Sequence, residues 1–299
     1  MSKMGQIFIK KYNLITIGML ISLLSIMIVG CRSNHHQQKI VIVSIQPQKA
    51  VLSEIVGDEY DVVCLLNSDN NPEAFEPSVS NLVSFESSDA YFRIGNIGFE
   101  LAILNNVRTN APNLKIYDTS KGVELLKGGH GHVLGHKHEH EIDPHIWTSV
   151  PNMMVIAKNM YDAMLEIDPE HSDEYTKNYN KLKTRLEALN NELAETLKPC
   201  CGTSFAVWHP SLSYFANDYG LNQVSIELEG KESSIKHLQD KIEEAKENDI
   251  KVFFLQKAFD GRRVEPITQE ICNNVVTINP MRNKWENEMR VIANAIAQQ

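Results

Sequence analysis

The sequence predicts an α/β protein of two lobes, each with a mostly parallel four-stranded sheet flanked by helices, joined by one long connecting helix. Two observations predict this fold. Short apolar, β-branched runs alternate with helical spacing from residue 39 to residue 118 and again from residue 204 onward, which is typical of parallel βαβ units. Between these two stretches, leucine and tyrosine recur at alternating steps of four and three, which indicates one long amphipathic helix.

The first lobe is expected at residues 39–168. Its strands are predicted by four apolar, β-branched runs, at 39–45, 61–66, 90–95 and 114–118. Its helices are predicted by apolar residues at helical spacing, at 46–56, 78–85, 99–104 and 151–165. Ser78 follows Pro77 and is expected to cap the second of these helices, because a serine at this position accepts a hydrogen bond from the helix backbone.

The connecting helix is expected at residues 169–198. One apolar stripe runs along it, with charged residues on the other faces: Tyr175, Tyr179, Leu182, Leu186, Leu189, Leu193 and Leu197. At about 1.5 Å per residue, a helix of about 25 residues is about 37 Å long, which is the span of a small domain. A coiled-coil seam is the competing interpretation, but the α/β pattern on both sides favours a connecting helix.

The second lobe is expected at residues 199–299, where the alternation resumes. Its strands are predicted at 204–209, 222–227, 251–256 and 274–279. Its helices are predicted at 211–219, 234–248 and 264–272. A last helix carries four apolar residues on one face: Trp285, Met289, Ile292 and Ile296.

The N-terminus has the features of a lipoprotein signal peptide. Residues 1–30 contain three lysines, no acidic residue and an apolar run that begins at Leu14. Cys31 follows directly and resembles the cysteine of a bacterial lipobox, whose thiol is acylated. We therefore expect a signal peptide at 1–30, a lipidated Cys31, a tether at 31–38 and a folded part outside the cytoplasm, anchored to a membrane at the periplasmic face or cell surface. A plain transmembrane anchor is the alternative.

The charge of the chain excludes nucleic acid as a partner. The sequence has 29 basic and 38 acidic residues, and without residues 1–30 it has 26 basic and 38 acidic residues, a formal net charge of −12. Binding to phosphate groups needs a basic face, whereas an acidic body is compatible with a cation as ligand. The cysteines other than Cys31 show no zinc-ribbon spacing, and both disulfides and free thiols stay open for them: Cys64, Cys200, Cys201 and Cys272.

Histidines are concentrated in one segment, for which we expect a loop at residues 129–142. Five of the 11 histidines lie within eleven positions: His130, His132, His136, His138 and His140. Neutral imidazole is the commonest protein ligand for zinc and its neighbours in the first transition row. We therefore expect these five side chains to capture metal in an accessory role. A solvated polar loop without a function is the alternative.

Three polar side chains stand where a strand passes into a loop or helix. Glu73 lies in the loop after the second strand, His145 lies between Pro144 and Ile146, and His209 ends the strand at 204–209. Ligands bind at the carboxyl ends of strands in parallel sheets. One carboxylate and two imidazoles suit a cation such as zinc, with a fourth position for water or a weak side-chain oxygen. Each residue alone also has a structural explanation, as a buried core histidine or a surface glutamate.

These motifs resemble the metal-binding substrate-binding lipoproteins of bacterial ABC importers, in the branch for zinc and manganese. The resemblance covers about residues 39–297 and is carried by these segments: Pro72–Ser78, the histidine-rich loop, Asp143–Trp147, His209–Phe215 and Gly230–Ser234. It implies two α/β lobes joined by a rigid helix, with the metal between the lobes. It also implies that His145 and His209 are ligands.

Two positions depart from the family pattern. Most relatives have a histidine where this chain has Glu73, and the manganese branch has an aspartate ligand where this chain has Asn279. Glu73 is therefore a ligand by position, with Glu76 as the competing carboxylate. Asn279 is a further candidate, in competition with water. The histidine-rich loop and the two imidazoles favour zinc over manganese, because manganese sites prefer carboxylates.

We therefore expect a monomeric extracytoplasmic binding protein that captures zinc and delivers it to a membrane-embedded ABC permease, without catalysis. The alternatives are a manganese- or iron-binding member of the same family, a zinc hydrolase and a surface adhesin. A hydrolase also uses two histidines, a glutamate and an open water position. The chain contains no His-Glu-x-x-His run, however, and no adhesive module is visible in it.

Overall fold

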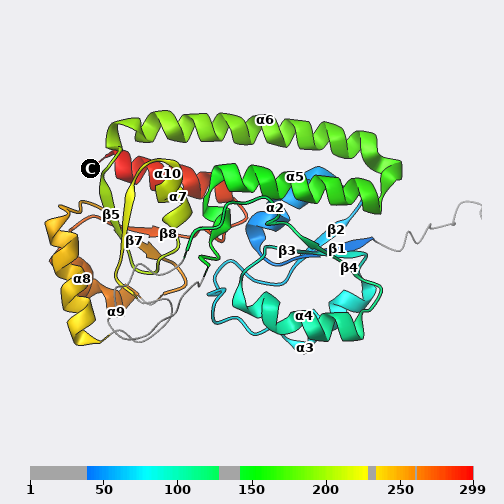
Figure 1. Cartoon of the computed structure of the whole chain (residues 1–299), viewed down its shortest axis with the longest axis horizontal. Coiled ribbons are helices and arrows are strands. Elements are labelled where there is room, and N and C mark those ends of the chain that lie inside the picture. Colours follow the sequence, from blue (N-terminus) through cyan, green and yellow to red (C-terminus); the bar gives the residue numbers. More distant parts are fainter. Residues whose placement is uncertain (1–38, 128–141, 228–233, 260, 299) are drawn as a thin grey trace, which may run out of the picture. The chain divides into compact units, whose positions relative to one another are not determined.

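The computed structural model describes residues 39–127, 142–227, 234–259 and 261–298 (Figure 1). The expected signal peptide, the tether with Cys31, and the five histidines at positions 130–140 lie outside the described residues. Among the described residues, no helix combines the length and the apolar character needed to cross a membrane. Four cysteines in this part of the chain are free thiols: Cys64, Cys200, Cys201 and Cys272.

Each lobe contains a four-stranded sheet in which all neighbouring strands are parallel. The first sheet has the order β2-β1-β3-β4, with β1 at Ile40–Val43, β2 at Asp61–Cys64, β3 at Ala90–Arg93 and β4 at Lys115–Asp118. The second sheet has the order β6-β5-β7-β8, with β5 at Ser204–Val207, β6 at Asn222–Ser225, β7 at Phe253–Gln256 and β8 at Val275–Ile278. The predicted fold class is thereby confirmed.

The helices follow the strands as the periodicity predicts. The first lobe has α2 at Gln46–Val56, α3 at Val79–Ser84, α4 at Gly98–Asn110 and α5 at Val150–Ile167; the second has α7 at Ser213–Asp218, α8 at Ile235–Glu247, α9 at Gly261–Ile271 and α10 at Trp285–Ala297. The predicted cap of α3 is confirmed, since the Ser78 hydroxyl accepts a hydrogen bond from Asn81 N at 3.3 Å. A short 3-10 helix, η2 at Ile146–Thr148, precedes α5.

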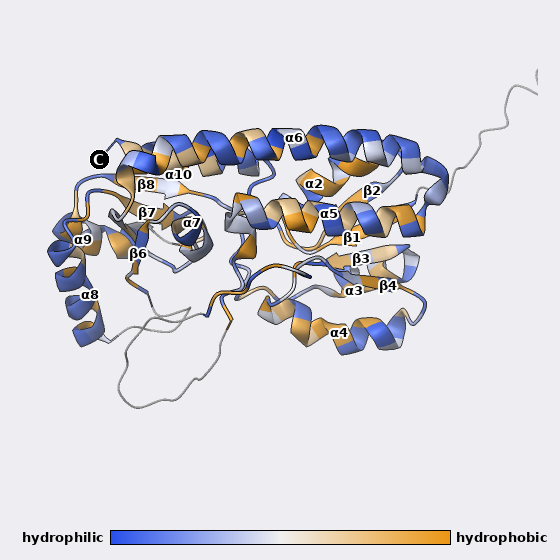
Figure 2. Ribbon diagram, turned by 45° about the horizontal axis from the view of Figure 1, so that its top comes forward, coloured by the Kyte–Doolittle hydropathy of each residue, from blue (hydrophilic) through white to orange (hydrophobic). Residues whose placement is uncertain are grey.

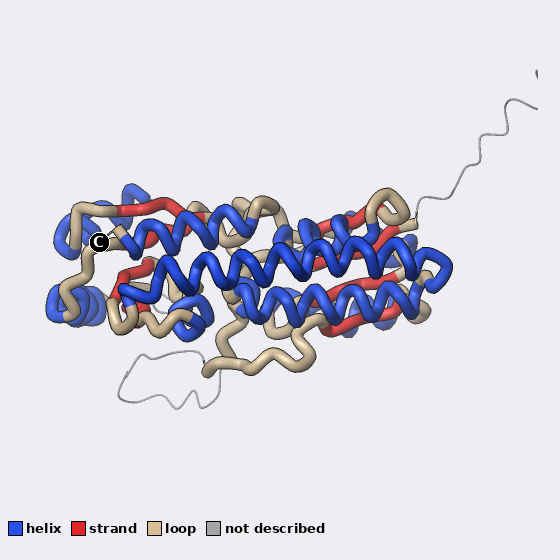
Figure 3. The backbone as a smooth tube through the Cα atoms, turned by 90° about the horizontal axis from the view of Figure 1, so that it is seen from above, coloured by secondary structure: helices blue, strands red, loops and turns tan. Residues whose placement is uncertain are grey.

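The long helix α6, at Ser172–Leu197, contacts helices of both lobes. It packs against α2 and α5 of the first lobe and against α10 of the second, and Figures 1 and 3 show it extending along them. All seven residues of the predicted stripe are buried, and Figure 2 shows hydrophilic and hydrophobic residues alternating along the helix. Arg185 of α6 binds Glu54 of α2 at 2.5 Å and Glu286 of α10 at 2.9 Å. The stripe therefore joins the two lobes through one hydrophobic core.

Candidate metal centre

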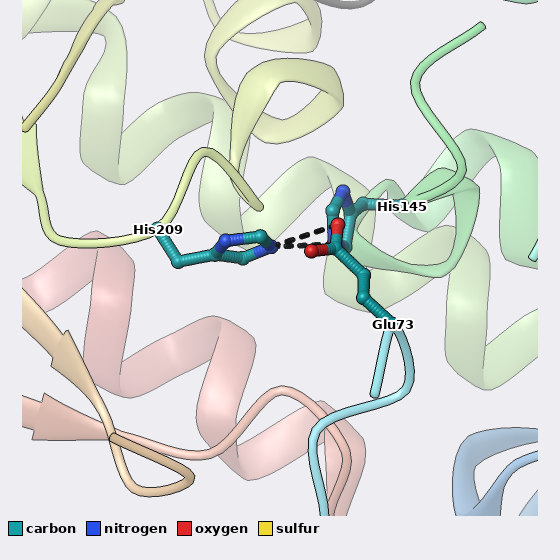
Figure 4. A group of neighbouring side chains, drawn as sticks. All are labelled: Glu73, His145 and His209. Atoms are coloured by element: carbon teal, nitrogen blue, oxygen red, sulfur yellow. Dashed lines mark hydrogen bonds and ion pairs between the residues drawn. The ribbon is translucent and has the colours of Figure 1, made fainter. Parts of the chain in front are cut away.

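Glu73, His145 and His209 meet with their ligand atoms within 4.8 Å of one another (Figure 4). His145 Nε2 lies 3.2 Å from His209 Nε2, and Glu73 Oε1 lies 3.3 Å from His209 Nε2 and 4.0 Å from His145 Nε2. Tetrahedral zinc, at about 2.0–2.1 Å from each ligand, separates its ligand atoms by about 3.3–3.4 Å. Two of the three separations already match this geometry. The third requires only a small shift of the Glu73 carboxylate.

The three side chains come from loops that the two sheets position. Glu73 lies in the loop between β2 and α3, where Asn71 Oδ1 accepts a hydrogen bond from Glu73 N at 2.9 Å. His209 follows β5 and is held by Gln256 at the end of the neighbouring strand β7. The Gln256 amide donates to His209 O at 2.6 Å, and Gln256 Oε1 accepts from His209 N at 3.3 Å. His145 directly precedes η2, and the Thr148 hydroxyl donates to its carbonyl at 2.9 Å.

The outer nitrogen of each histidine ring faces a carboxylate. His145 Nδ1 lies 2.9 Å from Asp143 Oδ1, and His209 Nδ1 lies 3.1 Å from Glu227 Oε2. A carboxylate accepts a hydrogen bond from the protonated Nδ1, which leaves Nε2 available to bind a metal and fixes the ring orientation. The sequence reasoning missed both carboxylates. Asp143 stands two residues before His145, and Glu227 follows β6, which lies beside β5, so both had a signal in the chain.

One aromatic ring packs against each imidazole. The Trp147 ring lies 5.1 Å from the His145 ring, and the Phe259 ring stacks on the His209 ring at 5.3 Å. The side chains of both histidines are 4% exposed, whereas that of Glu73 is 25% exposed. Glu73 therefore stands at the opening of the site, with the two histidines behind it.

The carboxylates of Glu73 and Glu227 keep the His209 ring protonated at neutral pH. Burial alone would lower the pKa of His209, but hydrogen bonds with Glu227 and Glu73 outweigh this effect and raise the pKa to about 9. Burial would raise the pKa of Glu73, but the hydrogen bond with His209 lowers it below its usual value. In the metal-free protein, the positive charge of His209 is therefore stabilised by the carboxylates that flank it.

Binding of a divalent cation has to displace this proton. We expect release of about one proton per metal ion at about pH 7.5, and an apparent affinity that falls about tenfold per pH unit below about pH 9. The sequence alone predicts a fall only below about pH 6.5, the ordinary pKa of imidazole. Calorimetric titrations in buffers of different ionisation enthalpy measure the proton count. An affinity unchanged from about pH 8 to about pH 6 would contradict this assignment.

Asn279 and Glu76, the other candidates from the sequence, have different surroundings. Asn279 is buried at the end of β8, where its side-chain oxygen accepts from Met281 N at 3.1 Å and its amide donates to Asp69 Oδ1 at 3.4 Å. Both of its polar atoms are thus engaged. Glu76 is exposed and does not belong to the group that Glu73 forms with the histidines.

Comparison with known proteins places the chain in a family context. The model of the family described as "ZnuA: Zinc-uptake complex component A periplasmic" matches residues 41–299. The chain is 33% identical to the protein of the solved structure "Crystal structure of ZnuA", with a TM-score of 0.80, over 87% of this chain and 98% of that one.

Two curated relatives match with lower identity. "Zinc-binding protein AdcA" of Streptococcus pyogenes serotype M3 is 24% identical over 84% of this chain and 52% of that protein. "Putative metal-binding protein" of Treponema pallidum is 26% identical over 86% of this chain and 84% of that protein. The chain thus spans about half the length of the streptococcal relative.

Proposed function

We propose that the chain, which belongs to the family of periplasmic zinc-uptake complex component A, captures zinc between its two lobes and delivers it to an ABC permease. The observation that carries this proposal is the convergence of Glu73 and His145 from the first lobe with His209 from the second. The ligand atoms already stand near tetrahedral separations, and each imidazole is oriented by a carboxylate. Binding and release of the ion without chemical turnover is the role that the family's description as an uptake-complex component supports.

Zinc is the metal that the ligand set favours. Two imidazoles and one carboxylate are typical zinc ligands, and both the matched family and the streptococcal relative are named for zinc. The Glu73 carboxylate is the observation that favours manganese or iron, because harder cations prefer oxygen ligands. Water or Asn279 completes the coordination; to ligate, Asn279 has to exchange its hydrogen bond with Met281 for the metal.

We further propose the division of the chain and the cellular context predicted from the sequence. Residues 1–30 are a signal peptide, Cys31 is lipidated and residues 31–38 tether the first lobe to the membrane. The first lobe, the connecting helix and the second lobe then comprise residues 39–168, 169–198 and 199–299. The protein is a monomer outside the cytoplasm, and its partner is the membrane-embedded permease.

Deletion of residues 130–140 tests the proposed function and separates the two kinds of metal ligand. We expect the full mature chain to bind about one zinc tightly and further zinc weakly, because the spacing of the histidines at 130–140 predicts no single preformed ligand geometry. The deletion variant should keep the tight site and lose the weak ones, as measured by calorimetric titration. A full chain without a tight site overturns the proposal. Loss of the tight site in the deletion variant alone shows that the histidine-rich segment contributes to it.

A further inference from the structure

The first two residues of α7 in the second lobe, Ser213 and Tyr214, contact Asp143 of the first lobe, which orients His145. The Tyr214 hydroxyl donates to Asp143 O at 2.9 Å. Hydrogen bonding to the Ser213 side chain is among the effects that lower the pKa of the Asp143 carboxyl. The Tyr214 hydroxyl also accepts a hydrogen bond from Leu126 N at 3.1 Å. Tyr214 is 2% exposed and Asp143 is 4% exposed, so these contacts are shielded from water.

A continuous series of hydrogen bonds links the second sheet to His145. Gln223 of β6 donates to Ser213 Oγ at 3.0 Å and accepts from Leu212 N at 2.7 Å, which fixes the start of α7. Because the Ser213 oxygen accepts from Gln223, its own proton is available for Asp143. The Asp143 carboxylate in turn holds His145 Nδ1 at 2.9 Å.

The same segment of the second lobe also carries His209. Ser213 lies four positions after His209, and the Ser211 hydroxyl, between them, accepts from the Gln256 amide that also binds His209 O. Movement of this segment away from the first lobe therefore has two effects at once. It withdraws one ligand, and it removes the hydrogen bonds that hold the orienting partner of the other.

We propose that Ser213 and Tyr214 are positioning residues that make the affinity for metal depend on contact between the two lobes. This inference rests on the proposed function. A ligating histidine depends on the partner of its other nitrogen, and loss of such a partner typically costs about 10–100-fold in metal affinity. Separation of α7 from Asp143 thus lowers the affinity of the His145 side without any change to a ligand, which provides a route to release.

The test compares hydroxyl removal at the start of α7 with a matched control at the residue that directly follows this helix. Ser213→Ala, Tyr214→Phe and the double variant remove the hydroxyl groups that contact Asp143 but keep the packing of the side chains. Tyr219→Phe removes the hydroxyl that donates to Asn190 Oδ1 at 3.1 Å, outside the site. We expect the double variant to bind zinc about 10–100-fold more weakly and to release it faster into excess chelator, with a smaller loss in each single variant. Tyr219→Phe and Ser213→Thr, which keeps the hydroxyl, should retain the wild-type affinity.

A second measurement separates positioning from general stability. In a His145→Ala background, Tyr214→Phe should cause no further loss of zinc affinity, because its effect passes through His145. The inference is overturned if the variant with both Ser213→Ala and Tyr214→Phe binds zinc with wild-type affinity. It is also overturned if Tyr214→Phe lowers the zinc affinity equally with and without His145. Absence of tight zinc binding in the unmodified chain overturns the proposed function itself, so the two failures are distinguishable.

Discussion

Replacement of His209 by alanine is expected to lower the affinity for zinc by more than about a hundredfold, equivalent to about 2.8 kcal/mol of binding free energy. Loss of an outer-shell partner alone costs about 10–100-fold, and His209→Ala removes the ligand itself. It also removes the positive charge between Glu73 and Glu227, which then face each other without a proton or imidazole to share. Competition with a chromophoric chelator measures the affinity.

His237→Ala is the matched control for this substitution. His237 lies on α8 and does not belong to the group of potential ligands among the described residues. Its replacement should leave the zinc affinity unchanged. A His209→Ala protein that binds zinc as the wild type does would show that the metal lies elsewhere.

Replacement of Glu73 by alanine is expected to weaken zinc binding by well over about tenfold, or more than about 1.4 kcal/mol. The carboxylate supplies the negative charge of the ligand set, and it lies at the opening of the site, where the ion enters. Glu73→His should keep zinc binding and shift the preference further from manganese, because an imidazole replaces the oxygen ligand that manganese prefers. Titrations with both metals measure the two affinities.

Glu76→Ala controls for the charge of the loop, since Glu76 lies three residues from Glu73 and is exposed. It should bind zinc as the wild type does. A zinc-edge anomalous map of crystals of the loaded protein locates the ion directly. We expect a peak about 2.0–2.2 Å from Glu73 Oε1 and from both Nε2 atoms. A peak beside Glu76, with Glu73 turned to solvent, would refute the assignment.

The fold could be predicted because its signals are local. The helix predicted at 46–56 coincides with α2, and the buried stripe of α6 follows from the spacing of seven apolar residues. The start of α9 was not predictable in this way, since the helix begins at Gly261, before the apolar spacing does, and contains Pro266. Propensity at a helix start is overridden by the packing that follows it.

The site could be predicted only in part, from the rule that ligands bind at the carboxyl ends of strands in parallel sheets. That rule holds for Glu73, after β2, and for His209, after β5. The expectation of a strand end at His145 was wrong, since among the described residues the strand before it, β4, ends at Asp118 and His145 directly precedes η2. The structure nevertheless brings the three side chains together. The rule says nothing of hydrogen bonds between distant segments. The bond from Tyr214 to Asp143 joins residues 71 positions apart, and the engagement of Asn279 by Met281 depends on the turn after β8.

The packing of α10 on α6 has a consequence for the order in which the chain can fold. Met289, Ile292 and Ile296 belong to the same core as the leucines of α6, and Arg290 binds Glu192 at 2.9 Å. Helix α10 thus covers part of a stripe that was completed almost a hundred residues earlier in synthesis. Until α10 is made, part of this stripe lacks its cover from the second lobe, and a nascent chain that stops before Trp285 leaves that part open to aggregation. Biosynthesis begins with the first lobe, but the core that α6 shares with the second lobe is complete only once α10 has been made.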